Sequence, residues 1–133
     1  MTSIEIIQSY YAAFNAGDPT GMLDLLTEEV IHDANEGGSE IGKEAFAKFL
    51  DRMDAHYREQ VEELVVMSNE DGTRASAEFY INGSYLKTDD GLPEANGQNY
   101  RIRVGAFFDL RNGKIARVTN YYNLQKWIEA VSI

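Results

Sequence analysis

Residues 100–123 read YRIRVGAFFDLRNGKIARVTNYYN, and they contain two runs in which apolar and polar side chains alternate. This alternation is typical of strands with one buried face, because successive strand side chains point to opposite sides of the sheet. Asn112-Gly113 stands between the two runs, and this dipeptide favours a tight hairpin turn. The stretch therefore predicts a β-hairpin with strands over 100–110 and 115–123.

Two more strand patterns precede this hairpin, over 61–67 and 73–86. Asp71-Gly72 separates them and predicts a second hairpin turn. Glycine inside a strand often marks a bulge or a bend, so we expect such irregularities at Gly83 and Gly105.

The N-terminal part of the chain has helical patterns instead. Thr2 and Glu5 have the spacing of a capping box, and an apolar face follows them. Asp18-Pro19 predicts the start of a short second helix, with an acidic N-cap and proline at the first helical position. A third helix is expected over 43–57, a glycine-rich loop precedes it, and a last short helix is expected over 124–131.

Helices followed by an antiparallel meander predict an α+β fold with the helices on one face of the sheet. Strands this long must bend in so small a protein, and helices that close a bent sheet leave a cone-shaped hollow. We therefore expect one domain over 1–133: a curved antiparallel sheet with about three N-terminal helices on its concave face.

Composition narrows the possible partners. The chain has 22 acidic and 12 basic residues, a formal net charge of −10, and no cysteine. Nucleic acids and anionic membranes require a basic surface, so neither is an expected partner. Disulfides and thiolate metal sites are excluded. Met1–Glu5 lacks the features of a signal peptide and no apolar run approaches the ~20 residues of a membrane span, so we expect a cytoplasmic protein.

The segments YYAAFNAGD (10–18), EVIHD (29–33) and 108–115 carry a further signal. Together they are similar to ketosteroid isomerases, which belong to the nuclear transport factor two-like superfamily together with SnoaL-like polyketide cyclases. The stretch 10–18, YYAAFNAGD, resembles the first helix of that family. The segment 29–33, EVIHD, followed by Gly42, resembles its catalytic strand and loop. The segment from Phe108 to Ile115, with Tyr121-Tyr122 beyond it, resembles its final hairpin.

The resemblance implies a catalytic site. In ketosteroid isomerases an Asp moves a proton between carbons while a Tyr and a protonated Asp hold the enolate oxygen. The general base would be Asp33 and the oxyanion tyrosine would be Tyr10. The position of the second oxyanion donor falls on Val104, or on Arg103 if the register slips by one residue, and neither side chain is an acid. The expected pocket wall comprises Phe14, Leu50, Phe79, Val104, Asn120 and Tyr122.

Other candidate residues have simpler interpretations. Because adjacent strand residues face opposite ways, His32 should point away from the pocket that Asp33 faces. The resemblance nevertheless keeps His32 as a further candidate, because dehydratases of this superfamily use histidines alongside Asp and Tyr. Tyr11 should be structural. Arg101 and Arg103 alternate with apolar residues and should lie on the outer sheet face. No spacing among His32, Asp33, Glu36 and Glu40 matches a known metal-ligand pattern, and no cofactor motif is present.

These observations predict a protein that binds a small hydrophobic carbonyl compound, with proton abstraction by Asp33 and no cofactor. Isomerisation, dehydration and cyclisation all begin with that step. One alternative is a binding module of the same fold without catalysis. Another is an epoxide hydrolase, which would need an Asp–Arg–Asp relay from Asp33, Arg103 and Asp109. Relatives commonly pair through the outer sheet face, so a homodimer is expected.

Overall fold

The computed structural model describes residues 1–132, so Ile133 of the expected domain lies outside the described residues. Four helices and six strands occur in this part of the chain. The helices are α1 (Ser3–Asn15), α2 (Pro19–Leu23), α3 (Lys43–His56) and α4 (Leu124–Val131). The strands are β1 (Leu26–Asp33), β2 (Ser39–Ile41), β3 (Tyr57–Ser68), β4 (Arg74–Tyr85), β5 (Gln98–Arg111) and β6 (Lys114–Tyr122). None of the described helices is long and apolar enough to cross a membrane.

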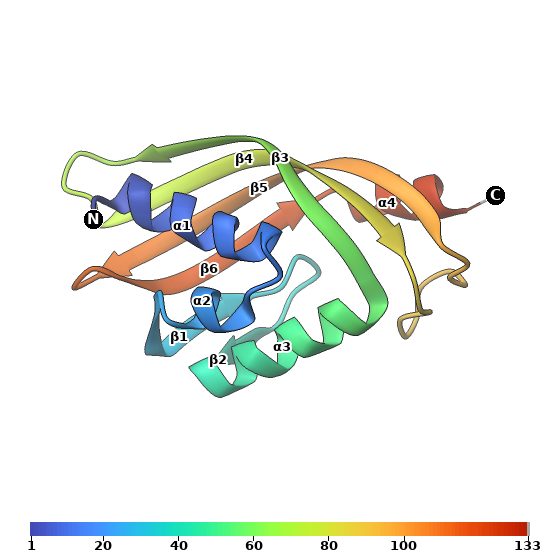
Figure 1. The fold of residues 1–133 in the computed structure, drawn as a ribbon, viewed down its shortest axis with the longest axis horizontal. Coiled ribbons are helices and arrows are strands. Elements are labelled where there is room, and N and C mark those ends of the chain that lie inside the picture. The colour runs from blue at the N-terminus through green and yellow to red at the C-terminus, as the bar shows by residue number, and fades with distance from the viewer. Residues whose placement is uncertain (133) are drawn as a thin grey trace.

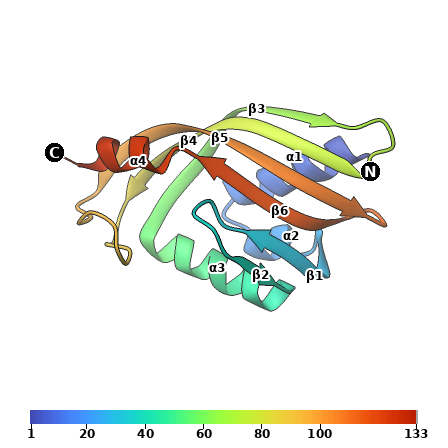
Figure 2. The same ribbon diagram turned by 180° about the vertical axis from the view of Figure 1, so that it is seen from behind.

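The six strands form one curved sheet in the order β2-β1-β6-β5-β4-β3. Helices α1 and α2 lie over one face of this sheet (Figure 1), which we call the inner face. Helix α3 contacts β1 and β2 at one edge and β3 at the other edge, so it bridges the two sides of the curve. Helix α4 packs on β5 at the far end. The opposite, outer face is turned toward the viewer in Figure 2, with α1 and α2 behind the strands. The expected α+β fold, with three N-terminal helices on a concave sheet, is confirmed.

The helix starts follow the local sequence signals. The Thr2 side chain accepts a hydrogen bond from the Glu5 backbone, and the Glu5 side chain accepts one from the Thr2 backbone. Asp18 caps α2 through the Gly21 backbone N–H, and Asn123 caps α4 in the same way. Each cap satisfies a backbone donor that the first helical turn leaves free.

Two features of the sheet depart from the sequence expectation. Strand β1 pairs with β6 in parallel, so the sheet is not purely antiparallel, and the glycine-rich loop continues into the short edge strand β2. The register shifts occur between Leu26 and Ile31, between Glu62 and Val65, and between Asp109 and Leu110. By contrast, β4 and β5 pair without interruption through Gly83 and Gly105. The bulges expected at the two glycines were therefore wrong.

Alternation along the strands sorts side chains onto the two faces. On β5, Val104, Ala106 and Phe108 are buried on the inner face. Arg101 and Arg103 lie on the outer face, as predicted, where they contact Glu62, Glu63 and Tyr80. The core is thus continuous with the inner face, and it leaves the cavity described next.

Candidate functional site

A cavity of about 370 Å³ lies between the helices and the inner face of the sheet. Its wall is mainly apolar, as in most small-molecule sites. The structure places the six residues of the expected pocket wall on this surface: Phe14, Leu50, Phe79, Val104, Asn120 and Tyr122.

Tyr10 and Tyr11 both line the cavity, and each is 5% exposed. Their rings meet edge to face with centroids 5.1 Å apart, and Tyr11 also packs on Phe79. Burial raises the pKa of Tyr10, which therefore keeps its proton. The hydroxyl of Tyr11 is buried without a hydrogen-bond partner among the described residues. Tyr11 was expected to have a structural role, and its ring does belong to the cavity wall.

His32 faces the cavity, which reverses the orientation expected from the sequence. Its side chain is 4% exposed and packs against the rings of Phe46 and Phe49, 5.0 and 4.3 Å away between centroids. Its Nδ1 is buried and bonded to no residue within 1–132. Burial lowers the pKa of His32, partly opposed by Glu40 and Asp33, so the imidazole is neutral at pH 7. A neutral imidazole is able to accept a proton.

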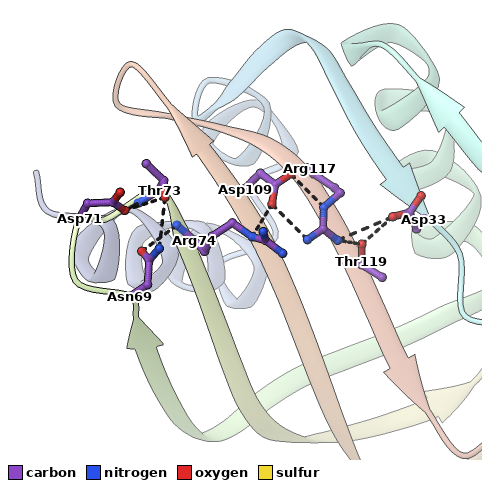
Figure 3. Close-up of polar contacts among 8 residues, drawn as sticks. All are labelled: Asp33, Asn69, Asp71, Thr73, Arg74, Asp109, Arg117 and Thr119. Atoms are coloured by element: carbon purple, nitrogen blue, oxygen red, sulfur yellow. Dashed lines mark hydrogen bonds and ion pairs between the residues drawn. The ribbon is translucent and has the colours of Figure 1, made fainter.

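Asp33 borders the cavity, but its carboxylate is bonded on the outer side of the sheet. One oxygen accepts from the Ser39 hydroxyl at 2.6 Å, and the other accepts from the Thr119 hydroxyl at 2.7 Å. Arg117 lies 3.7 Å from the second oxygen and forms a two-pronged ion pair with Asp109, which also binds Arg74. Figure 3 shows this chain of contacts crossing the strands on the outer face.

These contacts change what Asp33 is able to do. The hydrogen bonds from Ser39 and Thr119, with the nearby Arg117 guanidinium, lower the pKa of Asp33. The sequence suggested a carboxylate made basic by desolvation, whereas the structure shows one stabilised in its charged form and held by three partners.

A polar cluster lines the cavity at the end closed by α4. The Tyr57 hydroxyl donates to Asp89 at 2.9 Å, and Arg52 lies 3.4 Å from the same carboxylate. Tyr57 stacks on Tyr85, whose hydroxyl accepts from the Asp89 backbone N–H and donates to the Pro93 carbonyl. The β4–β5 loop is thereby fixed at the edge of the cavity.

The neighbouring inward position on β3 is Glu59, whose carboxyl accepts a hydrogen bond from Tyr100 at 2.5 Å. Burial raises the pKa of Glu59, and the hydrogen bond from Tyr100 opposes that shift. Burial also raises the pKa of Tyr122, which lies among Glu59, Glu36 and Asp89. The polar groups of the cavity therefore occur on two sides, with His32 on β1 and this cluster around β3.

Within residues 1–132, no group of three or more His, Cys, Asp or Glu side chains has the geometry of a metal site. The match to known sequences covers most of the chain: residues 7–118 match the SnoaL-like domain. The chain belongs to the SnoaL-like domain family. No curated protein sequence matches it.

Solved structures agree with this assignment. This SnoaL-like domain shares 55% identity with a proposed polyketide cyclase from Pseudomonas putida KT2440, with 99% of each chain covered and a TM-score of 0.98. A proposed polyketide cyclase from Xanthomonas campestris is also 55% identical, over 98% of this chain and 96% of that one, with a TM-score of 0.95. A Catenulispora acidiphila protein with a ketosteroid isomerase-like fold has 18% identity, covers 96% and 92% of the chains, and has a TM-score of 0.70. The similarity to the nuclear transport factor two-like superfamily is therefore confirmed at the level of the fold.

Several cavity residues of this SnoaL-like domain were missed in the sequence. Tyr57 was expected at the end of the third helix, but it begins β3. Because the expected strand began at Val61, the inward position of Glu59 two residues earlier was not considered. Asp89 lies in the loop between β4 and β5. Its buried position depends on contacts with Tyr57 and Tyr85, which no local sequence pattern reveals.

Proposed function

We propose that this SnoaL-like domain binds a small, mostly apolar carbonyl compound in the cavity and removes a proton from the carbon next to the carbonyl. The observation that carries the proposal is His32, a neutral imidazole in the cavity wall with an unpartnered Nδ1. Because burial lowers the pKa of His32, the ring is in the neutral form that accepts a proton.

The proposed step uses only groups of the protein. The C–H bond next to the carbonyl breaks, its proton passes to an imidazole nitrogen of His32, and its electron pair moves to the carbonyl oxygen as an enolate. General-base catalysis of this kind contributes about 10²–10⁴-fold. Return of the proton to another carbon gives isomerisation, loss of a leaving group gives dehydration, and attack on a second carbonyl gives cyclisation.

Hydroxyl groups around the cavity are candidates to stabilise the enolate oxygen. Tyr10, the donor implied by the family resemblance, lies on the wall and keeps its proton because burial raises its pKa. Preorganised donors of this kind are worth about 2.7–4 kcal/mol each. Tyr10 therefore stays in the proposal as an oxyanion donor.

Asp33 is the competing candidate for the base. Its lowered pKa and its bonds to Ser39 and Thr119 favour a structural role, and we propose His32 in its place. The epoxide hydrolase alternative is less well supported. Asp33, Arg117 and Asp109 do form an Asp–Arg–Asp chain, but neither Arg117 nor Asp109 lines the cavity.

We also propose a homodimer formed through the outer face. Phe107 and Tyr121 contact each other there with 45% and 56% of their surfaces exposed. Val65 and Met67 are half exposed on the same face. The same face carries the ion pairs of Arg101 with Glu62 and Glu63, and a two-fold axis would bring this one surface of two copies together.

The test of catalysis is exchange of the C1 protons of 2-tetralone, a small bicyclic ketone, in deuterated buffer, followed by NMR. We expect many exchange events per protein molecule. Leu50→Trp fills the cavity and should abolish the acceleration, whereas Lys48→Trp, exposed on the same helix, should preserve it. Saturable binding of 2-tetralone without exchange above the buffer rate would instead identify a non-catalytic binding module.

A further inference from the structure

Glu59 is a carboxyl group in the wall of a largely apolar cavity, on the inward side of β3 between Tyr57 and Val61. Its Oε2 accepts the hydrogen bond from Tyr100. Tyr100 is the one hydrogen-bond partner of this carboxyl among residues 1–132. Its other oxygen, Oε1, is therefore available to a molecule in the cavity.

Tyr100 holds this carboxyl in place because Tyr100 itself is fixed. Its ring lies directly over Gly83 of β4, where an added Cβ would come within 2.4 Å of the ring carbon Cζ. Trp127 of α4 also packs against this ring, edge to face with centroids 5.7 Å apart. The phenol proton is thus committed to Oε2, which leaves Oε1 as the oxygen that carries the proton when Glu59 is neutral.

The surroundings favour the neutral acid. Arg52, the basic residue on the cavity wall, is already paired with Asp89. The other titratable groups around this end are acidic or phenolic: Glu36, Asp89, Tyr57 and Tyr122. Because desolvation disfavours a charge without a cationic partner, burial raises the pKa of Glu59. A neutral carboxyl donates a hydrogen bond, whereas a carboxylate only accepts one.

We propose that Glu59, held by Tyr100, donates a hydrogen bond from Oε1 to the oxygen atom of the bound ligand. The proposal rests on the proposed function and names the chemistry that the site selects: an apolar compound with one carbonyl, enol or ether oxygen that accepts a hydrogen bond. Glu59 is on edge strand β3 and His32 is on β1, and α3 bridges these two parts of the sheet. The ligand oxygen would lie toward β3 and the carbon that loses its proton would lie toward β1.

Three aromatic probes of one shape test this assignment. Naphthalene has no oxygen, 2-naphthol resembles the enol of 2-tetralone, and 2-methoxynaphthalene has an oxygen that accepts but does not donate. We expect wild-type protein to bind 2-naphthol and 2-methoxynaphthalene about tenfold more tightly than naphthalene in fluorescence titrations. If Glu59 were an ionised acceptor, 2-methoxynaphthalene would bind no better than naphthalene, and the proposal would be overturned.

Two variants of Glu59 assign the preference to this residue. Glu59→Met removes the donor at similar length and should bring all three affinities together while preserving naphthalene binding. Glu59→Gln has an amide that both accepts from Tyr100 and donates to a ligand, so it should retain the preference. Retained preference in Glu59→Met, or lost preference in Glu59→Gln with naphthalene binding unchanged, would overturn the proposal.

Naphthalene binding distinguishes a failure of the Glu59 assignment from a failure of the proposed function. If naphthalene binds and the oxygen preference is absent, the role of Glu59 is wrong and the proposed cavity function stands. If naphthalene does not bind and 2-tetralone does not exchange, the proposed function itself fails. Circular dichroism will show whether Glu59→Met folds. If it does not, the wild-type ranking of the three probes and the behaviour of Glu59→Gln test whether Glu59 donates the hydrogen bond.

Discussion

The side chains of His32 and Asp33 are adjacent in the sequence but lie in opposite environments. His32 is enclosed by Phe46 and Phe49 and faces the cavity, where its pKa is lowered by burial. Asp33 is bonded to Ser39, Thr119 and Arg117 on the outer side of the sheet, where its pKa is lowered by hydrogen bonds and charge. A lowered pKa keeps His32 neutral but keeps Asp33 charged. This difference supports the proposal that His32 is the base, while Asp33 links β1 to β6 through Thr119.

At the residue scale, we predict that Asp33→Asn lowers the free energy of unfolding by about 1–2 kcal/mol at pH 7. Because the pKa of Asp33 is lower in the folded than in the unfolded protein, its stabilising effect is fully present above the unfolded value, near 3.9. The effect is lost as the pH falls through the folded value. Urea unfolding from pH 7 to pH 2 should show the two proteins converging in acid, and a constant difference would contradict the assignment.

At the scale of the elements, the strands β3, β4 and β5 position the acid of the cavity together. Glu59 pairs across the sheet with Gly83, and Gly83 pairs with Tyr100. The missing side chain of Gly83 gives the Tyr100 ring its place, and the ring then reaches Glu59. Gly83 on β4 thus sets the geometry of the hydrogen bond between Tyr100 of β5 and Glu59 of β3.

Gly83→Ala should therefore lower the free energy of unfolding by about 1–3 kcal/mol, because the new methyl group overlaps the Tyr100 ring. Gly105→Ala is the matched control, since its Cβ would have 4.0 Å of space to Phe107 and a normal strand conformation. In a Tyr100→Ala background, Gly83→Ala should cost little. An equal cost in both backgrounds, measured by urea unfolding, would show that the overlap with Tyr100 is not the cause.

Much of the element structure could be predicted because its signals are local. Asn112-Gly113 has φ values of 53° and 76°, as a type I′ turn requires, and the Thr2–Glu5 capping box starts α1. The directions of His32 and Asp33 could not be predicted, because they depend on the pairing of β1 with β6, which lies far from β1 in the sequence. Pocket residues such as Val104 were found through alternation and family resemblance, whereas Asp89 required the folded loop.

At the scale of the whole molecule, the two faces of the sheet have different roles. The inner face is covered by helices and encloses the cavity, while the outer face exposes Phe107, Tyr121, Val65 and Met67. The network from Asp33 to Arg74 crosses this outer face (Figure 3). Phe107 pairs with Thr119 of this network across β5 and β6. An exposed apolar patch of this kind is typical of an interaction surface.

We predict that Phe107→Asp combined with Tyr121→Asp converts a dimer into a monomer, because a two-fold contact would bring the added negative charges together. Sedimentation velocity measures the change directly. Lys48→Glu, on the exposed side of α3, is the control that adds negative charge elsewhere. A wild-type protein that is monomeric at 100 µM, or a double variant that stays dimeric, would exclude this interface.

The most direct test of the proposed chemistry compares His32→Gln with Asp33→Asn in the 2-tetralone exchange reaction at pH 7. With His32 as the base, His32→Gln should lower the exchange rate constant by at least about 100-fold, and Asp33→Asn should stay within about threefold of wild type. Naphthalene affinity, measured for each variant, shows that the cavity is intact. The opposite result, a large loss with Asp33→Asn and little change with His32→Gln, would return the role of base to Asp33 and contradict the orientation of β1 described above.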